Sequence, residues 1–352
     1  MKKSNRSASL DLIRCLAMLL VVLFHSYLYN GYYFRPQNSF TIWLANGFRW
    51  FSVGCIGLFL MLTGYLQSPK TDLRSCYRNL IPVLICYLMA SAISIPLRHF
   101  VFHDIHTPKG WLSMLIQFGA TSYGWYVVMY LCLSLLAPFI NVMLKHLSNK
   151  ALLLFAAVLL AITALPGATP LPIAPNYWRN LYPLSYYVLG ALVRRLQPII
   201  PAWMGILCAL GMAFLMGTVT LLSTNQDLSQ AINWEFQDLW VVFIVVCLFI
   251  SLYKLTIPAC FHKILAFGAN GCLGACMLSH LLDGWCYKIF PLWRTPSRYI
   301  LLFLCISIPI YVVSLAAGNL LQKCANIPAK YISKVLNILP GESLDSDEVS
   351  VK

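Results

Sequence analysis

The chain has 352 residues, of which 60% are hydrophobic and only 10% are charged, and its mean hydropathy is +0.73. A soluble domain carries about 25% charged residues, so this composition excludes a soluble enzyme, a disordered chain and a secreted disulfide scaffold. It indicates a polytopic membrane protein. We attribute the formal charge of +14 to basic loops on the cytoplasmic side of the membrane. Nucleic acid is not expected as a partner, because no basic tract with interleaved aromatic residues lies on a soluble segment.

Ten stretches of the chain are predicted to cross the membrane, since a spanning helix needs about 20 apolar residues. A backbone in lipid must satisfy its own hydrogen bonds, so we expect an all-α bundle of about ten transmembrane helices. The predicted spans, of which the fifth and sixth are short, are residues 10–30, 50–67, 80–97, 122–144, 151–165, 181–196, 199–222, 236–253, 264–282 and 299–322. The expected domains are an amino-terminal segment over 1–9, the ten-helix domain over 10–322 and a polar, acidic tail over 323–352.

Basic residues are distributed unequally over the predicted loops. If the amino terminus is cytoplasmic, the cytoplasmic segments carry about twice as many basic residues as the outer loops, to which Arg49 is assigned. This bias predicts that both termini are cytoplasmic. The first apolar run resembles a signal peptide, but Asp11 and Arg14 interrupt it and no small-x-small cleavage site follows. We therefore expect this run to be retained as the first helix.

The first predicted helix carries three polar residues, Asp11, Arg14 and His25. A charged residue at the centre of a span costs about 2.5–3.5 kcal/mol, so such residues usually face the protein interior or a wet cavity. From Arg14 to His25 the helix rotates by an angle that is within about 20° of three full turns, and it rises by about 16 Å. The two residues are therefore predicted to share one face, with Asp11 on the same side. In the alternative interpretation, Arg14 snorkels to the surface beside Asp11, and His25 is an ordinary buried or interfacial histidine.

The motif of this helix is the run Leu10-Asp11-Leu12-Ile13-Arg14-Cys15-Leu16-Ala17, followed by His25. It resembles the first-helix signature of acyltransferase family 3, integral membrane proteins that include bacterial O-acetyltransferases of envelope glycans. Weaker resemblances continue in the family's order to about residue 322. The first two are the stretch Ser52 to Leu66, with Thr63 where Ser is usual, and the basic loop with Arg74, Arg78 and Pro82. The next is the pair Trp125-Tyr126, with Tyr123 where the family often has His. The last is the stretch Asn270 to His280, with Cys272 and Ala275 in place of Ser and Tyr.

The resemblance implies a compact, single-domain enzyme of the bacterial inner membrane that transfers an acyl group. The donor would be acetyl-CoA, and the acceptor a hydroxyl of a cell-surface polysaccharide, such as an O-antigen, or of a lipid-linked sugar. The expected partners are this donor, the acceptor and membrane lipids. No tightly bound cofactor and no metal is expected; the histidines of the loop over 99–106 lack a partner motif for a metal. The sequence makes no prediction of the oligomeric state.

Under this hypothesis, His25 is the general base that acts on the acceptor hydroxyl, and imidazole is the usual group for that role near neutral pH. Direct transfer and a covalent acyl-imidazole both remain open. Arg14 is expected to hold a phosphate or another polar part of CoA, because a guanidinium binds phosphate in a bidentate manner. Asp11 is expected to orient Arg14 rather than to take part in the chemistry.

Four further residues are candidates for binding the donor or the acceptor, and each has an alternative explanation. Arg74 and Arg78 could bind the CoA phosphates, or simply reflect the basic bias of cytoplasmic loops. Trp125 could line the acyl pocket, or belong to an interfacial aromatic belt. His280 could bind the acceptor, or make a structural hydrogen bond.

Two other classes of protein are alternatives to an acyltransferase. A transporter or flippase for a glycan or small molecule would have ten spans and charges within the membrane, but it is expected to show paired halves with matching broken helices. No such internal repeat occurs in the sequence. A sensor or scaffold without chemistry would tolerate replacement of His25 by alanine.

Overall fold

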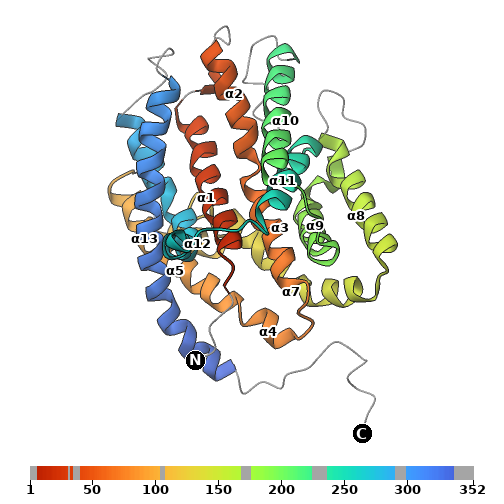
Figure 1. Cartoon of the computed structure of the whole chain (residues 1–352). Helices are drawn as coiled ribbons and strands as arrows, with labels where there is room; N and C mark the ends of the chain where they lie inside the picture. The colour runs from red at the N-terminus through yellow and green to blue at the C-terminus, as the bar shows by residue number, and fades with distance from the viewer. Residues whose placement is uncertain are drawn as a thin grey trace. The chain divides into compact units, whose positions relative to one another are not determined.

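A computed structural model describes residues 6–30, 32–34, 40–103, 108–167, 176–223, 236–289 and 299–336. In these ranges the secondary structure is helical, and they contain no strand (Figure 1). The helices are α1 (Ala8–Tyr29), η1 (Tyr32–Phe34), α2 (Phe40–Val53), α3 (Cys55–Gln67), α4 (Leu73–Tyr77), α5 (Leu80–Phe100), α6 (Pro108–Ile116), α7 (Gly124–His146), α8 (Asn149–Thr163), η2 (Leu165–Gly167), η3 (Asn176–Leu181), α9 (Tyr182–Leu196), α10 (Ala202–Ser223), α11 (Leu239–Leu252), α12 (Ala259–Ile289) and α13 (Tyr299–Leu336).

Seven helical stretches are long and apolar enough to cross a membrane in the part of the chain that the structure describes. Three shorter helices, α8, α9 and α11, have 15, 15 and 14 residues. Together these helices cover all ten predicted spans. The protein is therefore an all-α polytopic membrane protein, as the sequence predicted.

The boundaries differ most from the prediction in the second stretch and in the last helix. The second stretch begins at Phe40 rather than at residue 50, and it breaks at Gly54, whose N–H donates to the carbonyl of Phe51. Arg49 consequently lies within α2 and not in a loop, which corrects the assignment made from the charge distribution. The last helix continues to Leu336, well beyond the predicted end at residue 322.

The chain forms two compact units, and each is described by itself. Unit 1 comprises Met1–Tyr65, Ala151–Ala269 and Asp283–Tyr311, and unit 2 comprises Leu66–Lys150, Asn270–Leu282 and Val312–Lys352. The long helices α12 and α13 contribute to both.

In unit 1, α10 packs against both α2 and α11, and α1 contacts the same two helices (Figure 1). Side-chain hydrogen bonds connect α2 to α10. Asn46 Nδ2 donates to the carbonyl of Gly217 at 2.7 Å, and Trp50 Nε1 donates to Thr220 Oγ1 at 2.8 Å. Such bonds stabilise contacts between helices in lipid, where apolar side chains gain little by leaving the acyl chains. Helix α1 is therefore anchored in a firmly connected group of helices.

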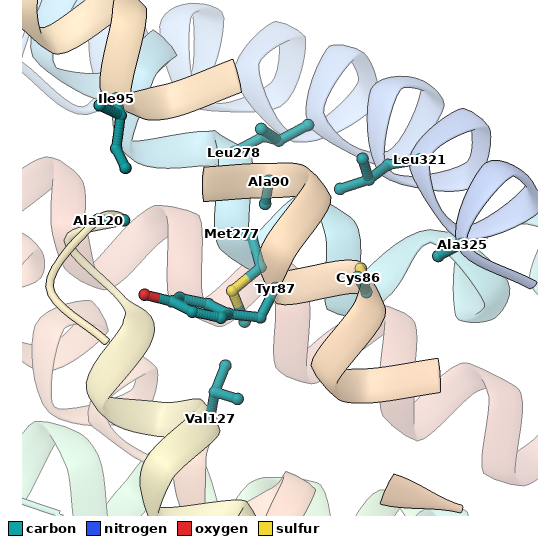
Figure 2. Packing of buried hydrophobic residues seen from close by; sticks show 10 residues of the cluster. All are labelled: Cys86, Tyr87, Ala90, Ile95, Ala120, Val127, Met277, Leu278, Leu321 and Ala325. Carbon is teal, nitrogen blue, oxygen red and sulfur yellow. The ribbon is translucent and has the colours of Figure 1, made fainter. Parts of the chain in front are cut away.

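In unit 2, α5 packs against α6 and α7, and small residues allow α12 and α13 to approach closely. A Cβ atom added at Gly274 would lie 2.6 Å from the carbonyl oxygen of Gly318. An apolar cluster fills the space between these helices (Figure 2), and its buried members are Cys86, Tyr87, Ala90, Ile95, Ala120, Val127, Met277, Leu278, Leu321 and Ala325.

Candidate functional site

Helix α1 carries the first-helix motif, and its apolar residues are packed inside unit 1. The helix begins after Ser7, whose extended backbone places it at the N-cap position. Asp11 lies in the first turn, where the positive end of the helix dipole favours a carboxylate. Asp11 is 1% exposed and His25 is 8% exposed, whereas Arg14 is half-buried. Both ends of the motif are therefore withdrawn from the surface.

The carboxylate of Asp11 is shared by two guanidinium groups. Arg14 Nη1 lies 2.7 Å from Asp11 Oδ1, and Arg6 binds the same carboxylate through Nε and, at 3.1 Å, through Nη2. Charge-assisted bonds of this kind are stronger than neutral ones. Asp11 therefore pairs with Arg14 and also with Arg6, which the sequence indicated only as a basic residue before the helix.

Several hydrogen bonds hold this end of α1 against neighbouring segments of unit 1. Arg6 Nη2 donates to the carbonyl of Ala266 at 3.1 Å, and Ser9 Oγ donates to the carbonyl of Tyr253 at 2.7 Å. Tyr311 OH donates to the carbonyl of Cys15 at 3.0 Å. The charged cluster is thus attached to the start of α12 and to α13, two segments far away in the sequence.

The imidazole of His25 has a defined tautomer. Its Nδ1 lies 2.8 Å from the carbonyl oxygen of Val21, one helical turn earlier. Because a carbonyl oxygen can only accept, Nδ1 must carry the hydrogen, and in the neutral ring Nε2 then bears the lone pair. The ring also meets Phe24 edge-on, with a centroid distance of 5.5 Å. This arrangement directs the basic nitrogen of a buried imidazole away from its own helix.

A chain of aromatic contacts connects His25 to an ion pair that the sequence analysis did not identify. Phe24 contacts Phe236 at a centroid distance of 5.6 Å, and Phe236 lies 6.5 Å from Tyr182. Two positions after Phe236 in the sequence, the buried Asp238 lies 3.9 Å from Arg179. Arg179 and Asp238 are separated by 59 positions, so no local pattern indicated that they would meet.

Arg49 was also missed as a buried group. It is 1% exposed, and its Nε donates to Tyr33 OH at 2.7 Å. The guanidinium lies 5.2 Å from the Tyr33 ring and 5.8 Å from the Trp50 ring, a contact that favours a cation. Its apolar neighbours in the sequence, Phe48 and Trp50, were the signal that could have indicated a position inside a helix.

Unit 2 contains the remaining candidates. His280 is buried, its Nδ1 lies 2.9 Å from the carbonyl of Met277, and its ring meets that of Tyr123 at 5.8 Å. Trp125 lies in the first turn of α7 and is 40% exposed. Unit 2 thus brings His280 next to the residue that stands where the family often has His, two positions before Trp125.

Arg74 and Arg78 lie at the short helix α4, which Asp72 caps by accepting from the N–H of Ser75 at 2.7 Å. Arg74 is half-buried and Arg78 is exposed. Their four-residue spacing places both on one side of the turn that leads into α5.

These observations describe a multi-pass membrane protein whose first helix carries a buried ionic cluster and a buried imidazole of defined tautomer. Residues 7–318 match the family model described as an acyltransferase domain, so the chain belongs to acyltransferase family 3. The match covers nearly the whole chain, and the protein is a membrane acyltransferase. Neither the comparison with curated proteins nor that with solved structures gave a match.

Proposed function

We propose that this protein is an O-acyltransferase that moves an acetyl group from acetyl-CoA to a hydroxyl of a cell-surface polysaccharide or of a lipid-linked sugar. The family membership supports acyl transfer. The hydrogen bond from His25 Nδ1 to the carbonyl of Val21 supports the chemistry, because it leaves Nε2 as the proton acceptor of the neutral ring. Nε2 can take a proton from a hydroxyl only in that tautomer.

In the proposed reaction, His25 Nε2 removes the proton of the acceptor hydroxyl while its oxygen attacks the thioester carbonyl carbon. The tetrahedral intermediate collapses with cleavage of the carbon–sulfur bond, and the CoA thiolate leaves. The imidazolium of His25 then returns the proton to the thiolate, so that the products are the acyl ester and CoA with a free thiol. In the alternative route, Nε2 of His25 first takes the acyl group from the thioester as a covalent acyl-imidazole, and the acceptor hydroxyl then takes the acyl group from the imidazole.

Arg14 is proposed to bind a phosphate or another polar part of the donor while Asp11 holds it. The shared carboxylate fixes the direction of the guanidinium and limits the rotamer freedom that binding would otherwise cost. Arg74 and Arg78 are proposed to bind phosphates of CoA, and Trp125 and His280 to bind substrate. Neither a resident cofactor nor a metal is part of this proposal.

The proposed location is the inner membrane of a bacterium, with both termini in the cytoplasm. The excess of basic residues in the loops on the amino-terminal side supports this orientation. It would place the ionic cluster of α1 on the side where acyl-CoA is made, and His25 about 16 Å deeper along the helix.

The proposal can be tested by NMR of purified surface glycan from cells with the intact chain, cells lacking it, and cells with His25→Ala or His25→Gln. We expect the rate of O-acylation to fall by about 10²–10⁴-fold in both variants, which is the usual contribution of a general base, and the O-acyl signals to fall with it. The matched control is His262→Gln, since His262 is an exposed histidine of α12. Unchanged O-acylation in His25→Ala at a normal protein level would contradict the assignment of His25.

A further inference from the structure

Unit 2 contains a cavity of about 620 Å³ where the start of α5 meets the last turns of α13. Arg78 lines it from the corner between α4 and α5, and Lys330 and Tyr331 line it from α13. Among the lining residues that the structure describes there is no acidic side chain. Two cationic groups from distant parts of the chain therefore face one cavity.

The corner that presents Arg78 is held in place by its own hydrogen bonds. The N–H of Arg78 donates to the carbonyl of Arg74 at 3.0 Å, and Asn79 Nδ2 donates to the carbonyl of Ser75 at 3.0 Å. Pro82 follows in the first turn of α5, where a missing N–H costs no helical hydrogen bond. The backbone at Arg78 is thus fixed before any ligand binds.

The opposite wall is one face of α13. Asn326, Lys330 and Ser333 are spaced at four and three residues, so they lie above one another on the helix, and all three line the cavity. Nearer the start of α13, Ala325 and Leu321 belong to the apolar cluster with Cys86 and Ala90 of α5 (Figure 2). The seam between α5 and α13 therefore holds the two walls of the cavity at a set distance.

We expect this cavity to lie at the edge of the membrane. Helix α13 has 38 residues and is about 57 Å long at 1.5 Å per residue, whereas the hydrocarbon core measures about 30 Å. The helix must therefore extend into the interfacial region, and its basic and aromatic residues Lys330 and Tyr331 are typical of that region.

We propose that this cavity binds a phosphate ester, with Arg78 and Lys330 as the groups that hold the phosphate. A guanidinium forms two parallel bonds to phosphate oxygens, and an ammonium adds a point charge. The volume lies within the range of about 300–1,000 Å³ that is usual for small-molecule sites, and therefore admits the group attached to the phosphate. The ring of Tyr331 and the side chain of Ile327 supply an apolar wall for that group.

Two sources of the phosphate ester share this chemistry. One is the head group of an anionic phospholipid, for which basic pockets at the cytoplasmic ends of membrane helices are suited. The other is the nucleotide end of CoA, and that branch rests on the proposed function. For both sources, the addition to the proposed function is Lys330 of α13, which would hold the phosphate together with Arg78.

The experiment uses the full-length protein in detergent and measures binding of two probes, adenosine 3′,5′-bisphosphate and a short-chain phosphatidylglycerol. Adenosine and a short-chain diacylglycerol serve as their counterparts without the phosphate. We expect one of the anionic probes to bind at least about tenfold more tightly than its counterpart, and this preference to be lost in Arg78→Gln and in Lys330→Gln. Lys330→Arg is expected to retain it, and the identity of the probe that binds assigns the source.

The matched control is Lys323→Gln, because Lys323 is an exposed lysine of the same helix that does not line the cavity. The proposal is overturned if neither anionic probe is preferred, or if Lys323→Gln weakens binding as much as Lys330→Gln. His25→Ala is expected to bind the probe like the wild type. Unchanged acyl transfer in His25→Ala with intact probe binding would therefore contradict the proposed reaction alone, whereas loss of acyl transfer with no preference for either anionic probe would contradict this site alone.

Discussion

Single residues decide how the first helix presents its charges. Asp11 neutralises parts of two guanidinium groups at once, so the cluster of Arg6, Asp11 and Arg14 keeps a net positive charge although its centre is a buried carboxylate. A lone arginine at this depth would be free to snorkel toward water. The shared carboxylate instead holds Arg14 in one direction, and the link from Arg6 to the carbonyl of Ala266 attaches the cluster to α12.

We predict that Asp11→Asn lowers both stability and activity. The substitution keeps the shape of the side chain but removes the charge that binds Arg6 and Arg14. Since both arginines are partly exposed, water would replace part of the interaction, and the expected cost is about 1–3 kcal/mol. Unfolding of a membrane protein is often irreversible, so the apparent melting temperature in detergent should be compared at one heating rate. Arg195→Gln, at an exposed position of α9, is the control; equal melting temperatures for both variants would refute the prediction.

At the scale of helices, α3 and α9 of unit 1 approach each other backbone to backbone. A Cβ atom added at Gly190 would lie 2.0 Å from the carbonyl oxygen of Met61, and one added at Gly64 would lie 2.0 Å from that of Tyr187. The obstacles are backbone atoms, which no side-chain rotation can remove. Small residues at such crossings allow membrane helices to gain van der Waals contact.

We therefore predict that Gly190→Ala separates α3 from α9 and destabilises the protein by about 1–3 kcal/mol, as overpacking usually does. Gly211→Ala is a matched control within α10, because nothing lies within 4 Å of a Cβ atom there. In that position alanine should be neutral or stabilising by up to about 1 kcal/mol. Thermal unfolding of the two variants side by side tests the prediction. A loss of stability in Gly211→Ala that matched the loss in Gly190→Ala would contradict it.

For the whole molecule, the sequence predicted the helical segments well because an apolar run that must cross a membrane has few structural options. It predicted the candidate residues of α1 because they lie on a single helix, where spacing alone determines the face. The sequence did not predict contacts between distant segments. Arg179 meets Asp238, and Lys330 shares a cavity with Arg78, only because tertiary packing brings their helices together. The burial of Arg49 was missed because its charge was taken to mark a loop outside the membrane.

The positions of the two termini decide whether the number of crossings is odd or even. The seven long helices alone would leave the termini on opposite sides of the membrane, whereas seven long and three short helices return the carboxyl terminus to the side of the amino terminus. Helices α8, α9 and α11 are only about 21–23 Å long, less than the hydrocarbon core of about 30 Å. They can cross only if flanking residues snorkel or the bilayer thins locally.

We predict that all three cross and that both termini are cytoplasmic, because Lys150 lies in the first turn of α8, and Arg194 and Arg195 lie in the last turn of α9. Reporter fusions at each terminus, one active only in the cytoplasm and one active only outside, measure this directly. As an internal check, a single cysteine in the loop between α9 and α10 should be shielded from an impermeant thiol reagent in intact cells, in a chain whose native cysteines have been replaced. Termini on opposite sides would mean an odd number of crossings, and the acyl donor and His25 would then have to be placed anew.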